Sequence, residues 1–598
     1  MADFAPLWEH DFPGRLEDEL DALKAEGVVP KIDQEWLGRG VLVLDFEWPL
    51  DQEILKLQAV FPDNYPWTRP EVYARELPGG RHVHPLSRGL CLIGRGTHRW
   101  LPDDHTLASL LKEQLPKIFS TAAAADDAEG VRDEDQQGEP AEAWWNGTTQ
   151  TAPDSYCLID SDWSVPPEHD HGTLTIQYVA AVEAGPRPRF RAYVDAVKDA
   201  KGKTLFRWGN GPLPPELRGK TTAINVPWAR ADKPPMPDAE TPSNLGILAA
   251  MHPSFAKYGA EKLTGASPLI ATMRCILYRT ELGHRSYGDG WLFLLPFAHK
   301  RNARLLKVLV LRTFRAGTSD IGARVPAVAS LRHQKVALFG LGAIGAPVAI
   351  DLARNGCGEL RLGEFDIVEP GNTVRWPLGA SAWGELKLDA LASFIRREYP
   401  KTRIVPLAAQ IGVSPALHDP CFDERRSVTA ISRALDGIDL VIDMTAEQGI
   451  NWILDEQCRK RGLPLINAHA TPTLAGGVVA RFLRREDDGC RMCLEYSWLD
   501  GTIPKPLGAD AVDDDLIQLQ PPGCNERTFT GASFDLNELS LEVVRLAVDT
   551  LSVPPSYPDQ SRAHIVQFKE EDGHRMPPRW EGVHVRRHAK CRCHSPAS

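Results

Sequence analysis

The strongest chemical signal in the chain is a glycine-rich turn. Gly340, Gly342 and Gly345 stand between a short apolar strand pattern and a run with helical spacing. Glycines in this context permit a tight turn and a close backbone approach to phosphates, and the start of the following helix adds free N–H groups and a positive dipole end. Glu364 ends the next strand pattern, where a carboxylate can bind ribose hydroxyls. We predict a nucleotide site, against the alternative of a turn that serves packing only.

The residues after Glu364 separate two kinds of nucleotide chemistry. Asp366, Asn372, Arg375 and Lys387 follow it in that order. Hydride transfer has no use for an arginine and a lysine at these positions. Transfer of an adenylyl group does, because its transition state is a crowded phosphate that cations stabilise. The order favours an ATP-dependent adenylating enzyme, while an NAD-dependent oxidoreductase and a non-catalytic scaffold stay open as alternatives.

This order resembles the ubiquitin-activating and ThiF–MoeB adenylyltransferase family, whose pattern is an acidic-x-Asp pair, then Asn, Arg and Lys. The resemblance implies a Rossmann-like ThiF domain that uses ATP and Mg²⁺. It implies that Glu364 holds the ribose, with Asp366 as the second member of the acidic pair. It also implies that Asn372, Arg375 and Lys387 contact the phosphates.

Two positions depart from the family pattern. Ala446 stands where a second Asp is expected, and Trp376 replaces the usual polar residue after the arginine. Asp443 matches the residue that opens the family's Asp-x-Thr-Asp segment, which implies a role in binding Mg²⁺, and we predict that Glu447 assists it. Arg324, upstream of the first strand, matches an arginine that this family inserts into the nucleotide site, often from a partner subunit.

Cysteines of the C-terminal half suggest two further roles. Cys490 and Cys493 form a C-x-x-C pair, and Cys591 and Cys593 form a C-x-C pair. The family often binds a structural Zn²⁺ with two such pairs, and the alternative is unpaired thiols. Cys524 lies in a proline–glycine loop pattern before the last predicted helix, where the resemblance implies a catalytic thiolate and the alternative is a buried structural cysteine.

The N-terminal region carries a second ordered set of motifs. The set comprises FPDNYPWTRP at 61–70, His84-Pro85, Cys91-Leu92, Trp100 and Pro102. In this order the motifs resemble ubiquitin-conjugating enzymes. The nucleophilic cysteine of that family accepts an acyl group from another thioester and passes it to an amine.

The resemblance implies that Cys91 is the acyl acceptor. The family also has an asparagine that stabilises the oxyanion formed when lysine attacks, but Leu86 occupies that position here. His82, His84 or His98 would then substitute for the asparagine, or the backbone would do so.

The hydrophobic patterns predict the elements that position these residues. Residues 1–121 show a helix, antiparallel strands, an irregular segment and a helix, which is an α+β domain of ubiquitin-conjugating type. Residues 122–144 form an acidic linker. Residues 145–315 carry alternating runs of a mixed α/β middle domain of unknown role. Residues 316–598 alternate strands and helices, which predicts a doubly wound α/β sheet.

Composition and charge argue against other classes of protein. The 598 residues are 43% hydrophobic and 25% charged, with a formal net charge of −12. Binding to nucleic acid or to an anionic membrane requires a positive field, so we expect neither partner. We find neither an 18-residue apolar window nor a signal-peptide pattern, and we expect a cytoplasmic protein with reduced thiols.

Taken together, the two halves resemble the fused conjugation enzymes of bacterial CBASS anti-phage systems. The resemblance implies that the C-terminus of a cGAS-like nucleotidyltransferase is adenylated, passes to Cys524 and then to Cys91, and joins a lysine of a target protein. A bacterial ubiquitin-like protein is an alternative substrate. A sulfur-carrier adenylyltransferase is a further alternative, although it gives Cys91 no role. The ThiF–MoeB resemblance also implies a homodimer.

Overall fold

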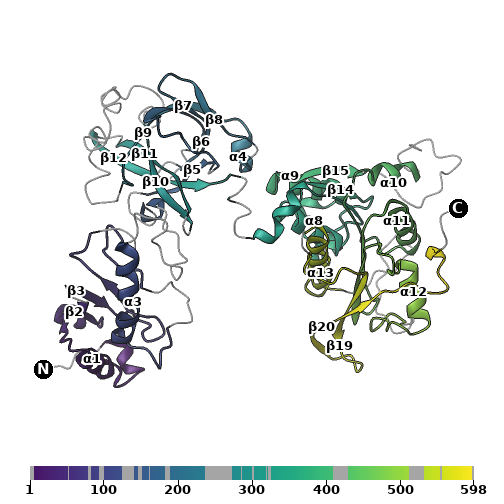
Figure 1. Ribbon diagram of the computed structural model, residues 1–598, viewed down its shortest axis with the longest axis horizontal. Coiled ribbons are helices and arrows are strands. Elements are labelled where there is room, and N and C mark those ends of the chain that lie inside the picture. Colours follow the sequence, from purple (N-terminus) through teal and green to yellow (C-terminus); the bar gives the residue numbers. More distant parts are fainter. Residues whose placement is uncertain are drawn as a thin grey trace. The chain divides into compact units, whose positions relative to one another are not determined.

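The computed structural model contains three β-sheets (Figure 1). It describes residues 6–50, 53–78, 82–92, 100–123, 141–145, 151–160, 162–181, 189–209, 211–235, 273–283, 286–299, 302–317, 320, 325–407, 428–510, 531–552 and 555–594. The chain groups into two compact units, Met1–Gly209 with Gly219–Gly317, and Asn210–Arg218 with Thr318–Ser598. The first unit holds two sheets and the second holds the third, while the predicted boundaries at 121, 144 and 315 stay predictions.

The first sheet is antiparallel, with the order β1-β2-β3-β4. Its strands are β1 (Lys31–Ile32), β2 (Val43–Leu50), β3 (Glu53–Val60) and β4 (Glu71–Tyr73), and its helices are α1 (Arg15–Ala25), α2 (Gln34–Leu37) and α3 (Leu107–Ala123). Leu55 and Leu57 of β3 are buried and Lys56 between them is exposed, because successive side chains point to opposite faces. The predicted α+β order is confirmed, and the likeness to ubiquitin-conjugating enzymes stays a prediction.

The second sheet closes into a barrel. Its strands are β5 (Thr151–Ile159), β6 (His171–Ala181), β7 (Arg189–Asp199), β8 (Thr204–Arg207), β9 (Thr222–Arg230), β10 (Arg274–Gly283), β11 (Ser286–His299) and β12 (Asn302–Arg315). β5 pairs with both β12 and β7, which closes the ring, and β8 extends it beyond β7. Apolar side chains that include Trp228 and Trp291 form the core.

The described residues of this middle region are mainly strands, whereas the sequence predicts a mixed α/β domain. The alternating runs at 173–182, 189–197 and 290–298 are confirmed as strands by β6, up to residue 181, and by β7 and β11. The helix described between residues 145 and 315 is the four-residue α4 (Pro215–Arg218). Residues 236–272 lie outside the described part of the chain, so the mixed composition stays a prediction.

The third sheet is doubly wound, as the sequence predicts. Its order is β15-β14-β13-β16-β17-β18-β19-β20. The first five of these strands are parallel: β15 (Arg403–Leu407), β14 (Glu359–Gly363), β13 (Lys335–Phe339), β16 (Leu440–Asp443) and β17 (Leu465–Ala470). The last three pair antiparallel: β18 (Gly476–Phe482), β19 (Arg562–Lys569) and β20 (Arg575–His584).

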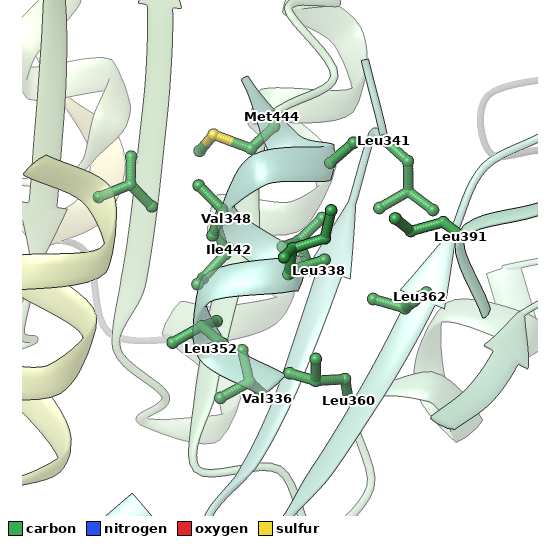
Figure 2. Packing of buried hydrophobic residues seen from close by; sticks show 14 of the residues in the cluster. Val336, Leu338, Leu341, Val348, Leu352, Leu360, Leu362, Leu391, Ile442 and Met444 are labelled. Carbon is green, nitrogen blue, oxygen red and sulfur yellow. The ribbon is translucent and has the colours of Figure 1, made fainter. Parts of the chain in front are cut away.

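Helices cover both faces of this sheet (Figure 1). One face packs against α8 (Gly345–Arg354), α9 (Lys387–Glu398) and α13 (Ser533–Leu551), and the other against α10 (Val428–Ala434), α11 (Gln448–Arg461) and α12 (Arg491–Leu499). Within β13, Val336 and Leu338 enter the first core (Figure 2), whereas Ala337 and Phe339 enter the second. Both faces are buried, which explains the continuous apolar strand pattern. Among the described helices, none is long and apolar enough to cross a membrane.

Candidate nucleotide-binding site

The candidate site lies where three neighbouring parallel strands end. The strand register pairs Phe339 of β13 with Gly363 of β14 and with Asp443 of β16. Gly340 and Glu364, each one residue past its strand, therefore lie at the same edge of the sheet. The strand order reverses between β13 and β16, and ligands of doubly wound sheets bind at such a reversal, beyond the carboxyl ends of the strands.

Packing requires glycine at two of the three positions of the turn. Gly340 has a φ of +85°, and a Cβ there would lie 2.6 Å from the carbonyl carbon of Met444. A Cβ on Gly345 would lie 1.9 Å from the carbonyl oxygen of Gly340. A Cβ on Gly342 would meet no heavy atom within 4 Å. Contacts with described residues therefore explain Gly340 and Gly345 but not Gly342.

The start of α8 offers backbone donors. The N–H groups of Gly342, Ala343 and Ile344 donate no hydrogen bond to any described residue, whereas the Gly342 carbonyl accepts from Ala346 N at 3.1 Å. N–H groups in this position, together with the positive end of the helix dipole, bind anions. The turn can therefore bind phosphate.

The carboxylate of Glu364 is bonded to the backbone around it. Its Oε2 accepts from Leu341 N at 2.8 Å, and its Oε1 accepts from Phe365 N at 2.8 Å and from Asp366 N at 3.0 Å. A carboxylate has about four acceptor positions, so one remains for a ribose hydroxyl. Glu364 holds the glycine turn in place, and its contact with ribose stays a prediction.

Lys387 is a largely buried cation at the same edge. It is the first residue of α9, with 8% of its surface exposed. Its Nζ forms an ion pair with Oδ2 of Asp366, and its backbone N–H donates to the Asp366 carbonyl at 2.8 Å. The structure thus brings together two residues that the sequence places in this site.

Arg375 and Asn372 belong to the short 3₁₀ segment η4 (Pro370–Val374) and its C-cap. The Asn372 Oδ1 accepts from Glu369 N at 3.0 Å, which stabilises the start of this segment. Burial lowers the pKa of Arg375, whose side chain also lines a pocket of about 510 Å³ beside α8. Their contacts with phosphates stay predictions.

Asp443 is fully buried at the end of β16. Its Oδ1 accepts from the backbone N–H and hydroxyl of Thr445 at 3.1 and 2.8 Å, and its Oδ2 accepts from Asn451 Nδ2 at 2.7 Å. Burial raises the pKa of Asp443, although these donors oppose the shift. One of about four acceptor positions remains, and carboxylate oxygens are ligands that Mg²⁺ prefers, so a contact of Asp443 with Mg²⁺ stays a prediction. Glu447, four residues further along the chain, is exposed and follows Ala446, which lies in the left-handed region (φ +57°).

Two residues of the site were not assigned a role from the sequence. Trp376 is buried and donates its indole N–H to the Leu341 carbonyl at 2.8 Å. Its departure from the family pattern was the signal that could have identified it. Asn451 lies eight residues after Asp443 on a predicted helix, and nothing in its sequence context distinguishes it.

The four cysteines converge, as the zinc prediction requires. Sγ–Sγ distances are 3.7 Å for Cys490–Cys493, 3.6 Å for Cys490–Cys591 and 3.4 Å for Cys493–Cys593, and all four sulfurs lie within 4.8 Å of one another. Four thiolates around Zn²⁺ at 2.3 Å would be about 3.8 Å apart. Bonds from Cys490, from Cys591 and from the His588 N–H lower the pKa of Cys493. The cluster fits Zn²⁺, whose presence is a proposal.

The surroundings of Cys91 are described in part. Cys91 is partly exposed, and its N–H donates to the His82 carbonyl at 2.9 Å. The His84 Nδ1 accepts from Leu86 N at 3.3 Å and from Ser87 N at 3.1 Å. Burial and the nearby Arg88 lower the pKa of His84, so its ring favours the neutral form. His84 stabilises its own turn, and its part in catalysis stays a prediction.

Three predicted residues lie outside the described part of the chain. They are His98, Arg324 and Cys524. The structure therefore gives no contacts for Cys524, and the assignment of Cys524 as the first acyl acceptor stays a prediction.

Comparison with known proteins identifies the class of the C-terminal unit. A model of the ThiF family matches residues 318–508. The match covers the glycine turn and the strands β13 to β18 of the third sheet, whereas β19 and β20 lie beyond it. This part of the chain is a ThiF domain, of the class of ATP-dependent adenylyltransferases.

Two relatives match almost the whole chain. The uncharacterized protein y4qC of Sinorhizobium fredii is 38% identical over 600 residues, which cover 97% of this chain and 96% of that protein. The uncharacterized protein y4oA of the same organism is 31% identical over 602 residues, covering 98% and 97%. The chain belongs to the family of these two proteins.

Shorter matches concern proteins of named activity and solved structures. The molybdopterin-synthase adenylyltransferase of Salmonella typhimurium is 28% identical over 166 residues, which cover 28% of this chain and 60% of that protein. The structure of PaaA matches with a TM-score of 0.31 and 17% identity, covering 44% of this chain and 67% of its own. The structure of E. coli MccB with ATP matches with a TM-score of 0.30 and 17% identity, covering 45% and 68%.

Proposed function

We propose that this chain activates the C-terminal carboxylate of a protein with ATP and transfers the acyl group through cysteine thiols to an amine. The observation that carries the proposal is the glycine turn with N–H groups that bond to no described residue, in the unit that also holds two cations, the largely buried Lys387 and the partly buried Arg375. Phosphate is the ligand that such cations and free N–H groups stabilise best. The ThiF match supports the same chemistry.

In the first step, an oxygen of the substrate carboxylate attacks the α-phosphorus of ATP. A new O–P bond forms and the bond to the β-phosphate oxygen breaks, so pyrophosphate leaves with the electron pair. We assign Glu364 to the ribose, and Asn372, Arg375 and Lys387 to the phosphates. In this assignment, Asn372, Arg375 and Lys387 would stabilise the charge that develops on the phosphate oxygens.

In the following steps, thiolates carry the acyl group. We assign Cys524 as the thiolate that attacks the acyl carbon, which forms a thioester and releases AMP. The Cys91 thiolate then takes the acyl group by thioester exchange. A lysine amine of the target displaces the Cys91 thiolate and loses a proton, which leaves an amide bond.

Two metal ions complete the proposal. Asp443, assisted by Glu447, would hold Mg²⁺, which would neutralise phosphate charge when bound. Arg324 would add a further positive charge near the nucleotide. The four clustered cysteines would hold Zn²⁺, which would tie α12 to the chain end after β20. None of the transfer steps needs the zinc site.

The substrate follows from the resemblance to CBASS conjugation enzymes. We propose the C-terminus of a cGAS-like nucleotidyltransferase, with a bacterial ubiquitin-like protein as the alternative, and a homodimer as the active form. The match to a molybdopterin-synthase adenylyltransferase supports a second candidate function, activation of a sulfur carrier. That function needs the ThiF domain but assigns no role to Cys91.

Trapping the thioester tests the relay. The chain is incubated with ATP and a purified cGAS-like nucleotidyltransferase, and adducts are separated with and without a thiol reductant. We expect an ATP-dependent, reductant-sensitive adduct in the Cys91→Ala variant, held on Cys524, and no such adduct in Cys524→Ala. An adduct that persists in Cys524→Ala and disappears in Cys91→Ala would contradict the order of transfer. The buried Cys157→Ala variant is the control.

A further inference from the structure

Trp376 is a buried side chain whose one polar group contacts the backbone of the glycine turn. The side chain is 4% exposed and packs in the core between the sheet and α8. Its indole N–H donates to the carbonyl oxygen of Leu341 at 2.8 Å. Leu341 is the second residue of the glycine turn and lies with Met444 at one end of this packed layer (Figure 2). A residue next to Arg375 is thus bonded directly to the turn.

The bond fixes the direction of a neighbouring donor. The Leu341 carbonyl and the Gly342 N–H belong to one peptide unit, which is planar and trans, so they point in opposite directions. Because Trp376 holds the carbonyl on the core side, the Gly342 N–H points away from the core. Gly342 is also the glycine whose added Cβ would meet open space.

A second bond fixes the preceding peptide unit. The Leu341 N–H donates to Glu364 Oε2 at 2.8 Å. Leu341 is therefore held at its N–H by one side chain and at its carbonyl by another. Rotation of either peptide plane would break one of these two hydrogen bonds and leave a polar group without its partner, which is unfavourable.

We infer that Trp376 is a positioning residue of the phosphate turn, which acts through the Leu341 carbonyl to direct the Gly342 N–H toward bound phosphate. The inference rests on the proposed function, since it needs a nucleotide at this turn. A packing role alone predicts something different. A buried tryptophan that only fills the core would affect stability equally with every ligand or with none.

The test compares ligands with and without phosphates. Affinities for ATP and for adenosine are measured by equilibrium dialysis for the wild type and for Trp376→Phe, which keeps an aromatic ring and removes the N–H. We expect the ATP affinity to fall roughly tenfold to a hundredfold, as for one lost hydrogen bond to a charged group, with the adenosine affinity unchanged. Trp580→Phe removes a comparable indole bond, to Glu538 Oε1 at 3.2 Å, and should change neither.

Two outcomes overturn the inference. Either Trp376→Phe binds ATP as tightly as the wild type, or it loses ATP and adenosine affinity equally. Failure of the wild type to bind ATP would instead contradict the proposed function itself. If Trp376→Phe shows no cooperative unfolding, Trp376→Gln takes its place, because its amide can donate to the Leu341 carbonyl. Its ratio of ATP to adenosine affinity should then exceed that of Trp376→Leu.

Discussion

Lys387 and Asp366 form an ion pair at the carboxyl edge of the third sheet, although Lys387 is largely buried and begins a helix. The positive end of the α9 dipole is unfavourable for a cation by about 0.3–1 kcal/mol. Burial adds a desolvation cost. The ion pair with Asp366 offsets these two costs and holds Lys387 at the edge where the phosphates are proposed to bind.

Removal of the Asp366 charge tests this relationship. We expect Asp366→Asn to lower the free energy of unfolding by about 1 kcal/mol, between the values for exposed and buried pairs, because Asp366 is half exposed. ATP would then supply the missing negative charge, so the ATP-induced rise in Tm should be larger than in the wild type. Asp351→Asn breaks another ion pair, with Arg354, and should leave the ATP-induced rise unchanged. An unchanged rise in Asp366→Asn would contradict the proximity of Lys387 to phosphate.

Alanine at two glycines should separate folding from nucleotide binding. Gly340→Ala puts a Cβ 2.6 Å from Met444 in a left-handed backbone, so we expect a loss of more than about 1 kcal/mol of stability. Gly342→Ala meets no described atom within 4 Å, and its stability should stay within about 0.5 kcal/mol of the wild type. We expect it to weaken ATP binding at least tenfold. Unfolding in denaturant and equilibrium dialysis measure the two effects, and wild-type ATP affinity in Gly342→Ala would disprove phosphate contact at this turn.

The amide of Asn451 should control the response to Mg²⁺. It donates to Asp443 Oδ2 at 2.7 Å, and partners of metal ligands typically change metal affinity about 10–100-fold. With ATP present, Mg²⁺ should raise the Tm further. We expect Asn451→Ala to need an at least tenfold higher Mg²⁺ concentration than the wild type to reach half of this additional rise. The ATP-induced rise in EDTA should not change. Asn355→Ala, which removes an amide bond to the Asp351 carbonyl, is the control, and equal Mg²⁺ requirements would argue against Asp443 as the metal ligand.

The thiol cluster should bind one zinc ion per chain. We expect elemental analysis of purified protein to show a ratio near one, and Cys591→Ser with Cys593→Ser to abolish it. Because a structural metal contributes its binding energy to folding, strong chelators should lower the Tm of the wild type but not that of the double variant. Cys357→Ser, at a buried cysteine outside the cluster, should keep the metal. A wild type that is free of zinc and unaffected by chelators would contradict this site.

Local patterns in the sequence were sufficient to predict the third sheet and the edge of its site. Apolar strand runs and the glycine turn placed Gly340 and Glu364 at the ends of neighbouring strands, and the register confirms that placement. Parallel strands align their carboxyl ends, so position along each strand determines position in space. Local pattern could not predict that the four cysteines converge, because Cys493 and Cys591 are 98 residues apart and meet only in the fold. The family resemblance was the basis for that prediction.

Contacts that depend on side-chain direction could not be predicted. Trp376 and Leu341 are 35 residues apart, and the spacing gives no sign of a bond between them. Asn451 looks like any polar residue of an amphipathic helix until its distance to Asp443 is known. The closure of the middle barrel by β5 is a pairing of strands far apart in sequence, which local alternation does not encode.

Exchange of labelled pyrophosphate into ATP tests the proposed activation of a protein carboxylate, because it requires a reversible adenylation step. We expect the wild type to catalyse exchange that depends on a protein substrate with a free C-terminal carboxylate. Lys387→Ala should reduce the rate about 10²–10³-fold, as for loss of a group that stabilises transition-state charge. Lys335→Ala, at the opposite end of β13, should leave the rate unchanged. Absence of exchange by the wild type with either proposed substrate, or a wild-type rate in Lys387→Ala, would contradict ATP-dependent adenylation at this site.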